Sequence, residues 1–156
     1  MRLTCLDEVG RLSEEPYGVR TLPGLYREWS TDGMIANVGA RIVEVGPGTL
    51  VLEATMQPER HGFPTSRGPI VHGGAIATLA DECLASVAFT LAEEGETTTT
   101  SNLQVDYYQP ATPGRLVARG VVRHRTRRLA YCHVTVEQDG GLVVAEGRAV
   151  IAYVKA

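Results

Sequence analysis

Apolar and polar residues alternate along several short segments of this chain. In residues 129–138 every second side chain is apolar, which is the period of a strand with one buried and one solvent-exposed face. Other segments are rich in β-branched residues and are bounded by Gly, Pro or Asp. The pattern predicts strands at 36–45, 49–57, 97–110, 114–126, 129–138 and 141–154. Gly46-Pro47-Gly48 lies between the first two and predicts a hairpin.

A long apolar helix is predicted between these two groups of strands. It covers "VHGGAIATLADECLASVAF", residues 71–89, and follows a Pro- and Gly-rich loop at 58–69. Two strands, one helix and four strands cannot form a doubly wound parallel sheet, because that fold needs a helix at each crossover. The sequence therefore predicts an α+β fold, with an antiparallel sheet around one long helix in residues 35–156. We expect residues 1–34 to form an N-terminal appendage of short helices or loop.

Composition narrows the classes of partner. The 156 residues are 44% hydrophobic and carry a formal net charge of −3, which suits one domain and argues against a nucleic-acid surface. Three cysteines without C-x-x-C spacing predict neither a disulfide framework nor a metal site, and we expect no cofactor. The N-terminus lacks the apolar core of a signal peptide, and no apolar run is long enough to span a membrane. We expect a cytoplasmic protein that binds small molecules or other protein chains.

The predicted helix carries two adjacent carboxylates in different surroundings. Glu82 belongs to a polar stripe with residues four apart, which favours a solvated carboxylate at the rim. Asp81 lies outside the stripe, and its helix neighbours at three and four residues are mostly apolar. Such a desolvated carboxylate is a candidate base or nucleophile. The alternative is a structural role, in which Asp81 caps a backbone group or pairs with an arginine in the core.

The start of this helix is a candidate oxyanion site. His72-Gly73-Gly74 leaves backbone N–H groups unpaired at the positive end of the helix dipole, and the glycines allow a ligand to approach closely. Gly73 and Asp81 are eight residues apart, or about 12 Å along the axis, so they cannot both contact one carbonyl carbon. They either serve different purposes or meet across a two-fold axis, with Gly73 of one chain facing Asp81 of its partner.

These residues carry a family resemblance. "GPIVHGGAIATLADECLA" and the strands that begin at "NLQVDYYQPATPG" resemble the hotdog-fold acyl-CoA thioesterases of the phenylacetate-degradation type, over roughly residues 35–154. The resemblance implies a hotdog fold, an acyl-CoA substrate and self-association as a homodimer or a dimer of dimers. The expected reaction is hydrolysis of the thioester to free acid and CoA.

The resemblance also implies roles for individual residues. Asp81 would be the nucleophile or general base, and Gly73, from the partner subunit, would donate its N–H to the thioester carbonyl. His72 would support the loop, and Gly74 would allow the substrate to approach. A hydroxyl residue that orients water falls on Thr100, with Ser101 as the near alternative. A family position that is usually Asn or Gln, six residues before His72, is here Ser66.

A basic segment, residues 123–128, is a further candidate binding site. Within "RHRTRR", Arg125, Arg127 and Arg128 are candidate ligands of the CoA phosphates, the alternative being a solvated turn.

Two other functions are possible for such a domain. One alternative function is a hotdog enoyl or hydroxyacyl thioester hydratase-dehydratase, which would use a histidine with a carboxylate. The other is a non-catalytic acyl-CoA-binding protein. The first is disfavoured because the acid, not a histidine, lies in the apolar part of the helix.

Overall fold

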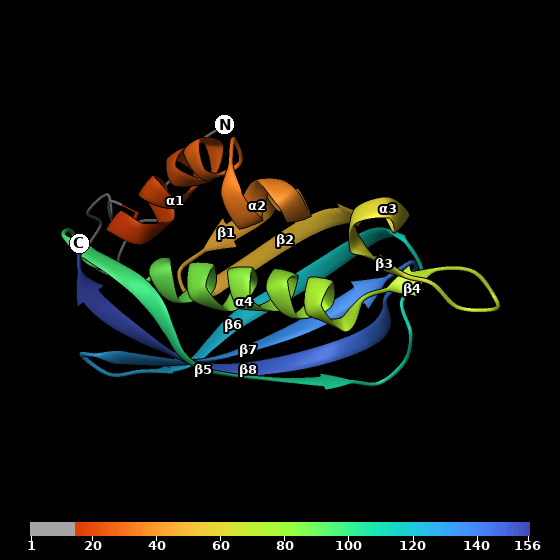
Figure 1. Ribbon diagram of the computed structural model, residues 1–156. Coiled ribbons are helices and arrows are strands. Elements are labelled where there is room, and N and C mark those ends of the chain that lie inside the picture. The colour runs from red at the N-terminus through yellow and green to blue at the C-terminus, as the bar shows by residue number, and fades with distance from the viewer. Residues whose placement is uncertain (1–14) are drawn as a thin grey trace.

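Helix α4 (Gly73–Phe89) is the central element of the computed structural model, which describes residues 15–156. One side of the helix faces a curved sheet and is fully buried there, through Leu79, Ala80, Cys83, Leu84 and Val87. The sheet wraps around this side, whereas part of the opposite side stays open (Figure 1). The segment is apolar on nearly all sides because the helix that it forms is covered over most of its circumference.

The sheet has six strands in the order β1-β2-β6-β7-β8-β5, and every neighbouring pair is antiparallel. The strands are β1 (Arg41–Gly46), β2 (Thr49–Met56), β5 (Glu96–Tyr107), β6 (Gly114–Arg125), β7 (Leu129–Gln138) and β8 (Leu142–Lys155). This arrangement confirms the predicted α+β class, with an antiparallel sheet wrapped around one long helix. The hairpin predicted at Gly46–Gly48 is also present, because β1 and β2 pair up to Gly46 and Thr49.

Glycine at position 120 sets how closely the sheet approaches the helix. A Cβ atom added to Gly120 of β6 would lie 2.8 Å from the Cys83 sulfur and 3.3 Å from Val87. The alternation predicted for residues 129–138 holds in β7, where Ala130, Cys132, Val134 and Val136 are buried under α4. Helix and sheet thus form one close-packed layer pair.

The N-terminal segment contributes two helices that pack on α4 (Figure 1). They are α1 (Tyr17–Trp29) and α2 (Gly33–Val38). Leu22 and Tyr26 of α1 are buried in the core, and a Cβ atom on Gly18 would lie only 1.8 Å from the Phe89 carbonyl oxygen. The first fourteen residues of the predicted appendage lie outside the described part of the chain. The domain boundary at residue 35, which falls inside α2, stays a prediction.

Two segments differ from the sequence prediction. Residues 36–38 were expected to begin a strand but belong to α2, because Asp32 caps the helix at its start and Gly39 ends it with a φ of 68°. The loop expected at 58–69 begins with a helical turn, α3 (Pro58–His61), and contains β3 (Gly62–Phe63), which pairs with β4 (Ile70–Val71). Helix capping in the first segment and the pairing of β3 with β4 in the second outweigh the composition of these segments. Among the described helices, none combines the length and hydrophobicity needed to cross a bilayer.

Candidate active site

Asp81 lies half-buried in the middle of α4 and contacts the edge strand β5. The Thr100 hydroxyl donates a hydrogen bond of 2.7 Å to Asp81 Oδ1. Thr100 stands at a β-bulge, where the register of β5 against β8 shifts between Thr100 and Asn102. Ser101 is the extra residue of this bulge and is exposed. Of the two predicted hydroxyl residues, the structure therefore brings Thr100 to Asp81 and turns Ser101 to solvent.

The first turn of α4 leaves one backbone donor open. His72 is the N-cap residue, and its Nδ1 accepts a hydrogen bond of 2.9 Å from the Gly74 N–H. A Cβ atom on Gly74 would lie 3.0 Å from His72 Nδ1, so glycine gives the imidazole room to cap the helix. Among the described residues, none accepts a hydrogen bond from the Gly73 N–H. The helix N-terminus thus presents the Gly73 donor with the positive end of its dipole.

Tyr107, at the end of β5, fixes this turn from the other side. Its hydroxyl donates a hydrogen bond of 2.8 Å to the Gly73 carbonyl oxygen. A Cβ atom on Gly73 would lie 3.4 Å from the Tyr107 ring. This contact was not predicted, since no local pattern places a tyrosine beside a helix that starts thirty-four residues earlier. Strand β5 therefore contacts α4 at both predicted catalytic positions.

Glu82 differs from its predicted place at a solvated rim. The Tyr26 hydroxyl of α1 lies 2.9 Å from the Ser86 hydroxyl and donates a longer hydrogen bond, of 3.4 Å, to Glu82 Oε2. Burial raises the pKa of the Glu82 carboxyl to about 7, and the neighbouring Asp81 charge adds to the shift, while the Tyr26 contact lowers it. The C-terminal part of the predicted polar stripe is covered: Ser86 is buried against Tyr26 of α1, and Thr90 is buried where it accepts the Gly48 N–H of the β1–β2 hairpin.

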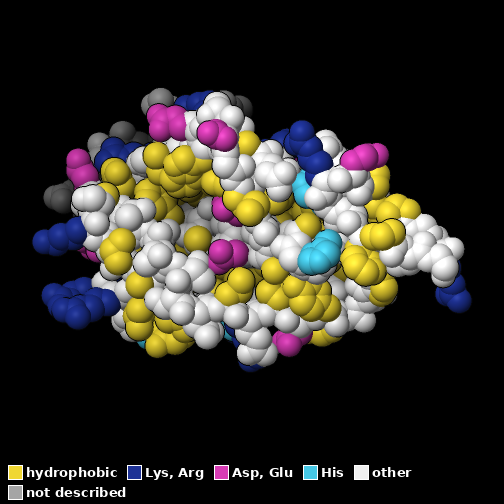
Figure 2. All heavy atoms as spheres, viewed as in Figure 1, with side chains coloured by type: hydrophobic (Ala, Val, Ile, Leu, Met, Phe, Trp, Pro, Cys, Tyr) yellow, Lys and Arg dark blue, Asp and Glu magenta, His cyan; other side chains and the backbone are white. Residues whose placement is uncertain are grey.

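Both carboxylates belong to the face of the molecule that α4 presents. Acidic side chains lie in the middle of this face and are flanked by hydrophobic ones (Figure 2). Asp81 is half-buried, and Gly74 at the start of the helix is exposed. The Gly73 donor and the Asp81 carboxylate are about 12 Å apart along the same axis. Within one chain they form two separate half-sites on one accessible face.

The predicted substrate-binding residues lie outside this centre. Ser66 is exposed in the loop between β3 and β4, beside a turn closed by Thr65 and Gly68. Arg127 and Arg128 are exposed in the turn between β6 and β7. This turn lies near the C-terminal end of α4, since Tyr153 binds Arg128 through its backbone and the Ala88 carbonyl through its hydroxyl.

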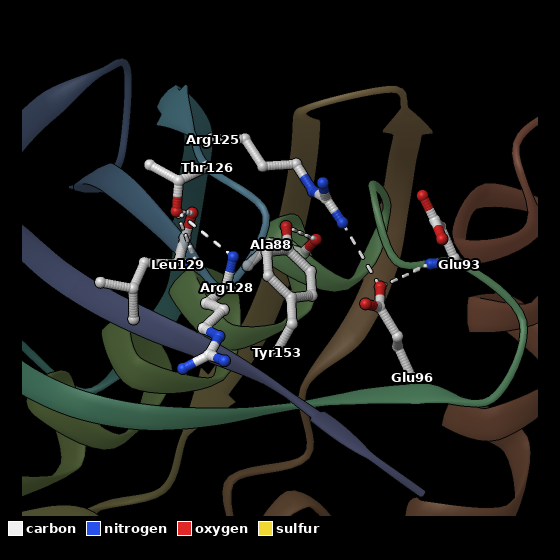
Figure 3. Close-up of polar contacts among 8 residues, drawn as sticks. All are labelled: Ala88, Glu93, Glu96, Arg125, Thr126, Arg128, Leu129 and Tyr153. Carbon is white, nitrogen blue, oxygen red and sulfur yellow. Dashed lines mark hydrogen bonds and ion pairs between the residues drawn. The ribbon is translucent and has the colours of Figure 1, made fainter.

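Arg125 makes different contacts from the other two arginines. Its Nη2 lies 3.3 Å from Glu96 Oε2, and its guanidinium stacks on the Tyr153 ring at 4.2 Å from the centroid. The Arg128 guanidinium points away from this pair (Figure 3). The three arginines therefore do not form one cluster. Arg125 is engaged within the protein, whereas Arg127 and Arg128 extend into solvent.

Comparisons with known proteins agree with this architecture. A protein-family model described as "Thioesterase superfamily" matches residues 68–145, which include both half-sites. No curated protein matches the sequence significantly.

Solved structures of similar fold cover most of the chain. The PaaI protein of E. coli, from the phenylacetic acid degradation operon, is 18% identical, with a TM-score of 0.76 over 92% of this chain and 98% of that one. A phenylacetic acid degradation-related protein of Ralstonia eutropha is 24% identical, with a TM-score of 0.71 over 87% and 98%. A thioesterase family protein of Silicibacter pomeroyi is 23% identical, with a TM-score of 0.76 over 88% and 99%. These likenesses confirm the hotdog fold predicted from the sequence.

Proposed function

Because the chain belongs to the thioesterase superfamily, we propose that it hydrolyses acyl-CoA thioesters to a free acid and CoA, with Asp81 as the reacting carboxylate. The observation that carries this proposal is the hydrogen bond of 2.7 Å from Thr100 to Asp81, on the face of α4 that the sheet leaves open. A carboxylate held by one neighbouring hydroxyl keeps its second oxygen available for the reaction.

The chemistry needs a carboxylate on one side of the thioester and a donor on the other. Asp81 either attacks the thioester carbon, forming an anhydride that water then cleaves, or removes a proton from the water that attacks it. In both routes the carbon–sulfur bond breaks and the sulfur leaves as the CoA thiolate, which takes up a proton. Thr100 holds Asp81 through one oxygen, so the other oxygen faces the substrate. Negative charge that develops on the carbonyl oxygen is stabilised by a backbone N–H.

The Gly73 N–H is the proposed oxyanion donor, and it comes from a partner subunit. The estimated 12 Å between Gly73 and Asp81 prevents a single chain from using both on one carbon. Two α4 helices that lie antiparallel across a two-fold axis bring Gly73 of one chain to Asp81 of the other, twice per dimer. The exposed edge strand β5 supports such an assembly, since the residues from Ser101 to Gln104 are all solvent-accessible.

His72 has a supporting role in this mechanism. Its Nδ1 accepts the Gly74 N–H, which leaves the preceding N–H of Gly73 for the substrate. Gly74 then serves mainly to admit the imidazole ring. The hydratase alternative requires a histidine nitrogen at the reacting carbons and is disfavoured because the acid, not a histidine, lies in the apolar part of α4.

The CoA phosphates are proposed to bind at the turn between β6 and β7. Arg127 and Arg128 are exposed there and can meet phosphate groups, whereas Arg125 would first have to release Glu96. A cytoplasmic location fits an acyl-CoA substrate and the free, buried thiols of Cys83 and Cys132 in the described part of the chain.

The test is the release of CoA thiol from a panel of aryl, short-alkyl and medium-alkyl CoA thioesters, with enoyl-CoA hydration measured in parallel. We expect thiol release with at least one class and no hydration. Hydration without thiol release would establish the hydratase. Binding of acyl-CoA without either reaction would establish a non-catalytic binding protein.

A further inference from the structure

A cavity of about 390 Å³ opens between the N-terminal helices and the C-terminal half of α4. Leu22 and Trp29 of α1 and Met34 of α2 form its outer wall. Glu82 and Phe89 of α4 form part of its inner wall. The volume lies in the range of sites that hold a small organic group. The mechanism above does not use this cavity, and it gives the N-terminal helices no role.

The cavity begins one helical turn from Asp81. Two hydrogen bonds tie β5 to α4 in the same way: Thr98 donates to the Ala85 carbonyl at 3.1 Å, and Thr100 donates to Asp81 at 2.7 Å. Thr98 and Ala85 line the cavity, so the cavity wall lies directly beside the hydrogen bond between Thr100 and Asp81. Asp81 and Ala85 are four residues apart, or about 6 Å along the helix. A group attached to a carbonyl carbon at Asp81 can therefore extend into this space.

Glu82 is the half-buried carboxylate in this wall. The other carboxylate, Asp32, is exposed to solvent and accepts the Gly33 N–H at 2.7 Å as a helix cap. Glu82 accepts only the long bond of 3.4 Å from Tyr26, whose shorter contact is with Ser86. In a cavity that excludes part of the solvent, a hydrogen bond to a half-buried carboxylate is stronger than at the open surface, and a ligand hydroxyl can donate it. A second carboxylate brought into the cavity would be repelled.

We propose, on the premise that the protein hydrolyses acyl-CoA thioesters, that this cavity holds the acyl group and that Glu82 selects uncharged acyl groups bearing a hydroxyl. Trp29 and Met34 close the outer end of the site and limit the length of the acyl group. Trp29 is 38% exposed and Met34 is 58% exposed, which places both at the rim. The N-terminal helices are then a specificity element for the reaction at Asp81.

The experiment compares matched substrates on the full chain. Hexanoyl-CoA, 6-hydroxyhexanoyl-CoA and adipoyl-CoA differ only at the end remote from the thioester, and phenylacetyl-CoA with its 4-hydroxy derivative forms an aryl pair. At pH 8.5, above the Glu82 pKa of about 7, we expect the hydroxyl to raise kcat/KM about tenfold in the pair that fits the cavity, as a hydrogen bond to a charged group does. Adipoyl-CoA should be the poorest alkyl substrate.

Variants assign the selection to named residues. Glu82→Leu, which keeps much of the side-chain volume, should reduce the hydroxyl preference to less than about twofold, and Glu82→Gln should retain part of it, because the amide oxygen still accepts. Trp29→Ala should shift the preferred alkyl chain to a longer one. Glu44→Leu, on β1 at the far edge of the sheet, is the matched control and should keep the preference. Thermal unfolding confirms that each variant is folded.

Failure of this inference is distinguishable from failure of the proposed function. If unsubstituted thioesters are hydrolysed but neither hydroxyl derivative is preferred, or the preference survives in Glu82→Leu, Glu82 is not the selecting residue. If Trp29→Ala leaves the chain-length profile unchanged, the cavity does not hold the acyl group. If no thioester in the panel is hydrolysed, the proposed function itself is wrong.

Discussion

The Thr100 hydroxyl donates a hydrogen bond of 2.7 Å to Asp81 Oδ1, joining the edge strand to the middle of the central helix. The β-bulge after Thr100 decides which hydroxyl makes this contact. It inserts Ser101 as an extra residue that is exposed to solvent, and Thr100 is left facing Asp81. The carboxylate is therefore oriented by a strand that pairs with only one neighbour, β8.

Asp81→Asn tests the reacting carboxylate. The amide keeps the shape of the side chain but loses the basic oxygen, so kcat should fall by about 10²–10⁴-fold while acyl-CoA binding stays within a few-fold of wild type. Single-turnover thiol release and calorimetric binding measure the two effects. Asp139→Asn, in the exposed turn between β7 and β8, is the control and should remain active. A fully active Asp81→Asn would return Asp81 to a structural role.

Thr100→Val tests the partner of that carboxylate. Valine keeps the β-branched shape and removes the donor, so kcat should fall about tenfold with little change in KM. Thr100→Ser should restore most of the rate. Thr99→Val, at the neighbouring exposed position, is the control. If Ser101→Ala reduced turnover more than Thr100→Val, Ser101 would be the assisting hydroxyl.

Subunit mixing tests the shared site. Gly73→Val blocks approach to the backbone donor and Asp81→Asn removes the carboxylate, so each variant alone should be inactive. When the two are unfolded, mixed equally and refolded, half of the dimers are heterodimers that contain one intact site. We expect roughly a quarter of wild-type activity to return. In a site built within one chain every site would contain a lesion, and no activity would return.

Glu82 should make stability depend on pH. Its folded pKa of about 7 lies above the ordinary value of 4.5, so the folded state holds the proton more tightly than the unfolded state. The resulting stabilisation is fully present below about pH 4.5 and is lost as the pH rises through about 7. Allowing for solvent screening of a partly exposed side chain, we expect a change on the order of 1–2 kcal/mol.

Urea unfolding of wild type and Glu82→Gln measures this change. The free energy of unfolding of Glu82→Gln, relative to wild type, should rise by that amount between pH 4.5 and pH 8, because the amide does not ionise. Glu44→Gln, an exposed glutamate of β1, should show no such trend. A difference between wild type and Glu82→Gln that is constant with pH would mean that Glu82 titrates alike in both states.

Salt dependence tests the exposed arginines. If Arg127 and Arg128 meet the CoA phosphates, KM should rise with ionic strength, and replacing both by Gln should flatten that dependence. Hydrolysis of acyl-pantetheine, which lacks the nucleotide phosphates, should be unaffected by the double substitution. Arg60→Gln, on the exposed surface of α3, is the control. An unchanged salt response would identify the β6–β7 turn as a solvated charge cluster.

The sequence alone determined the central helix, the six strands of the main sheet and their order along the chain, because the periods of two and 3.6 residues are local properties of each segment. It also placed Asp81 and the His72-Gly73-Gly74 turn on one helix, and their incompatible spacing follows from helix geometry alone. Tertiary structure decided which of these side chains meet. Tyr26 and Glu82 are fifty-six residues apart in the chain, and only the packing of α1 on α4 brings Tyr26 to Glu82 and Ser86. The register shift in β5 selects Thr100 over Ser101, and Glu96 with Tyr153 engages Arg125. Such contacts depend on elements distant in sequence, and no local pattern records them.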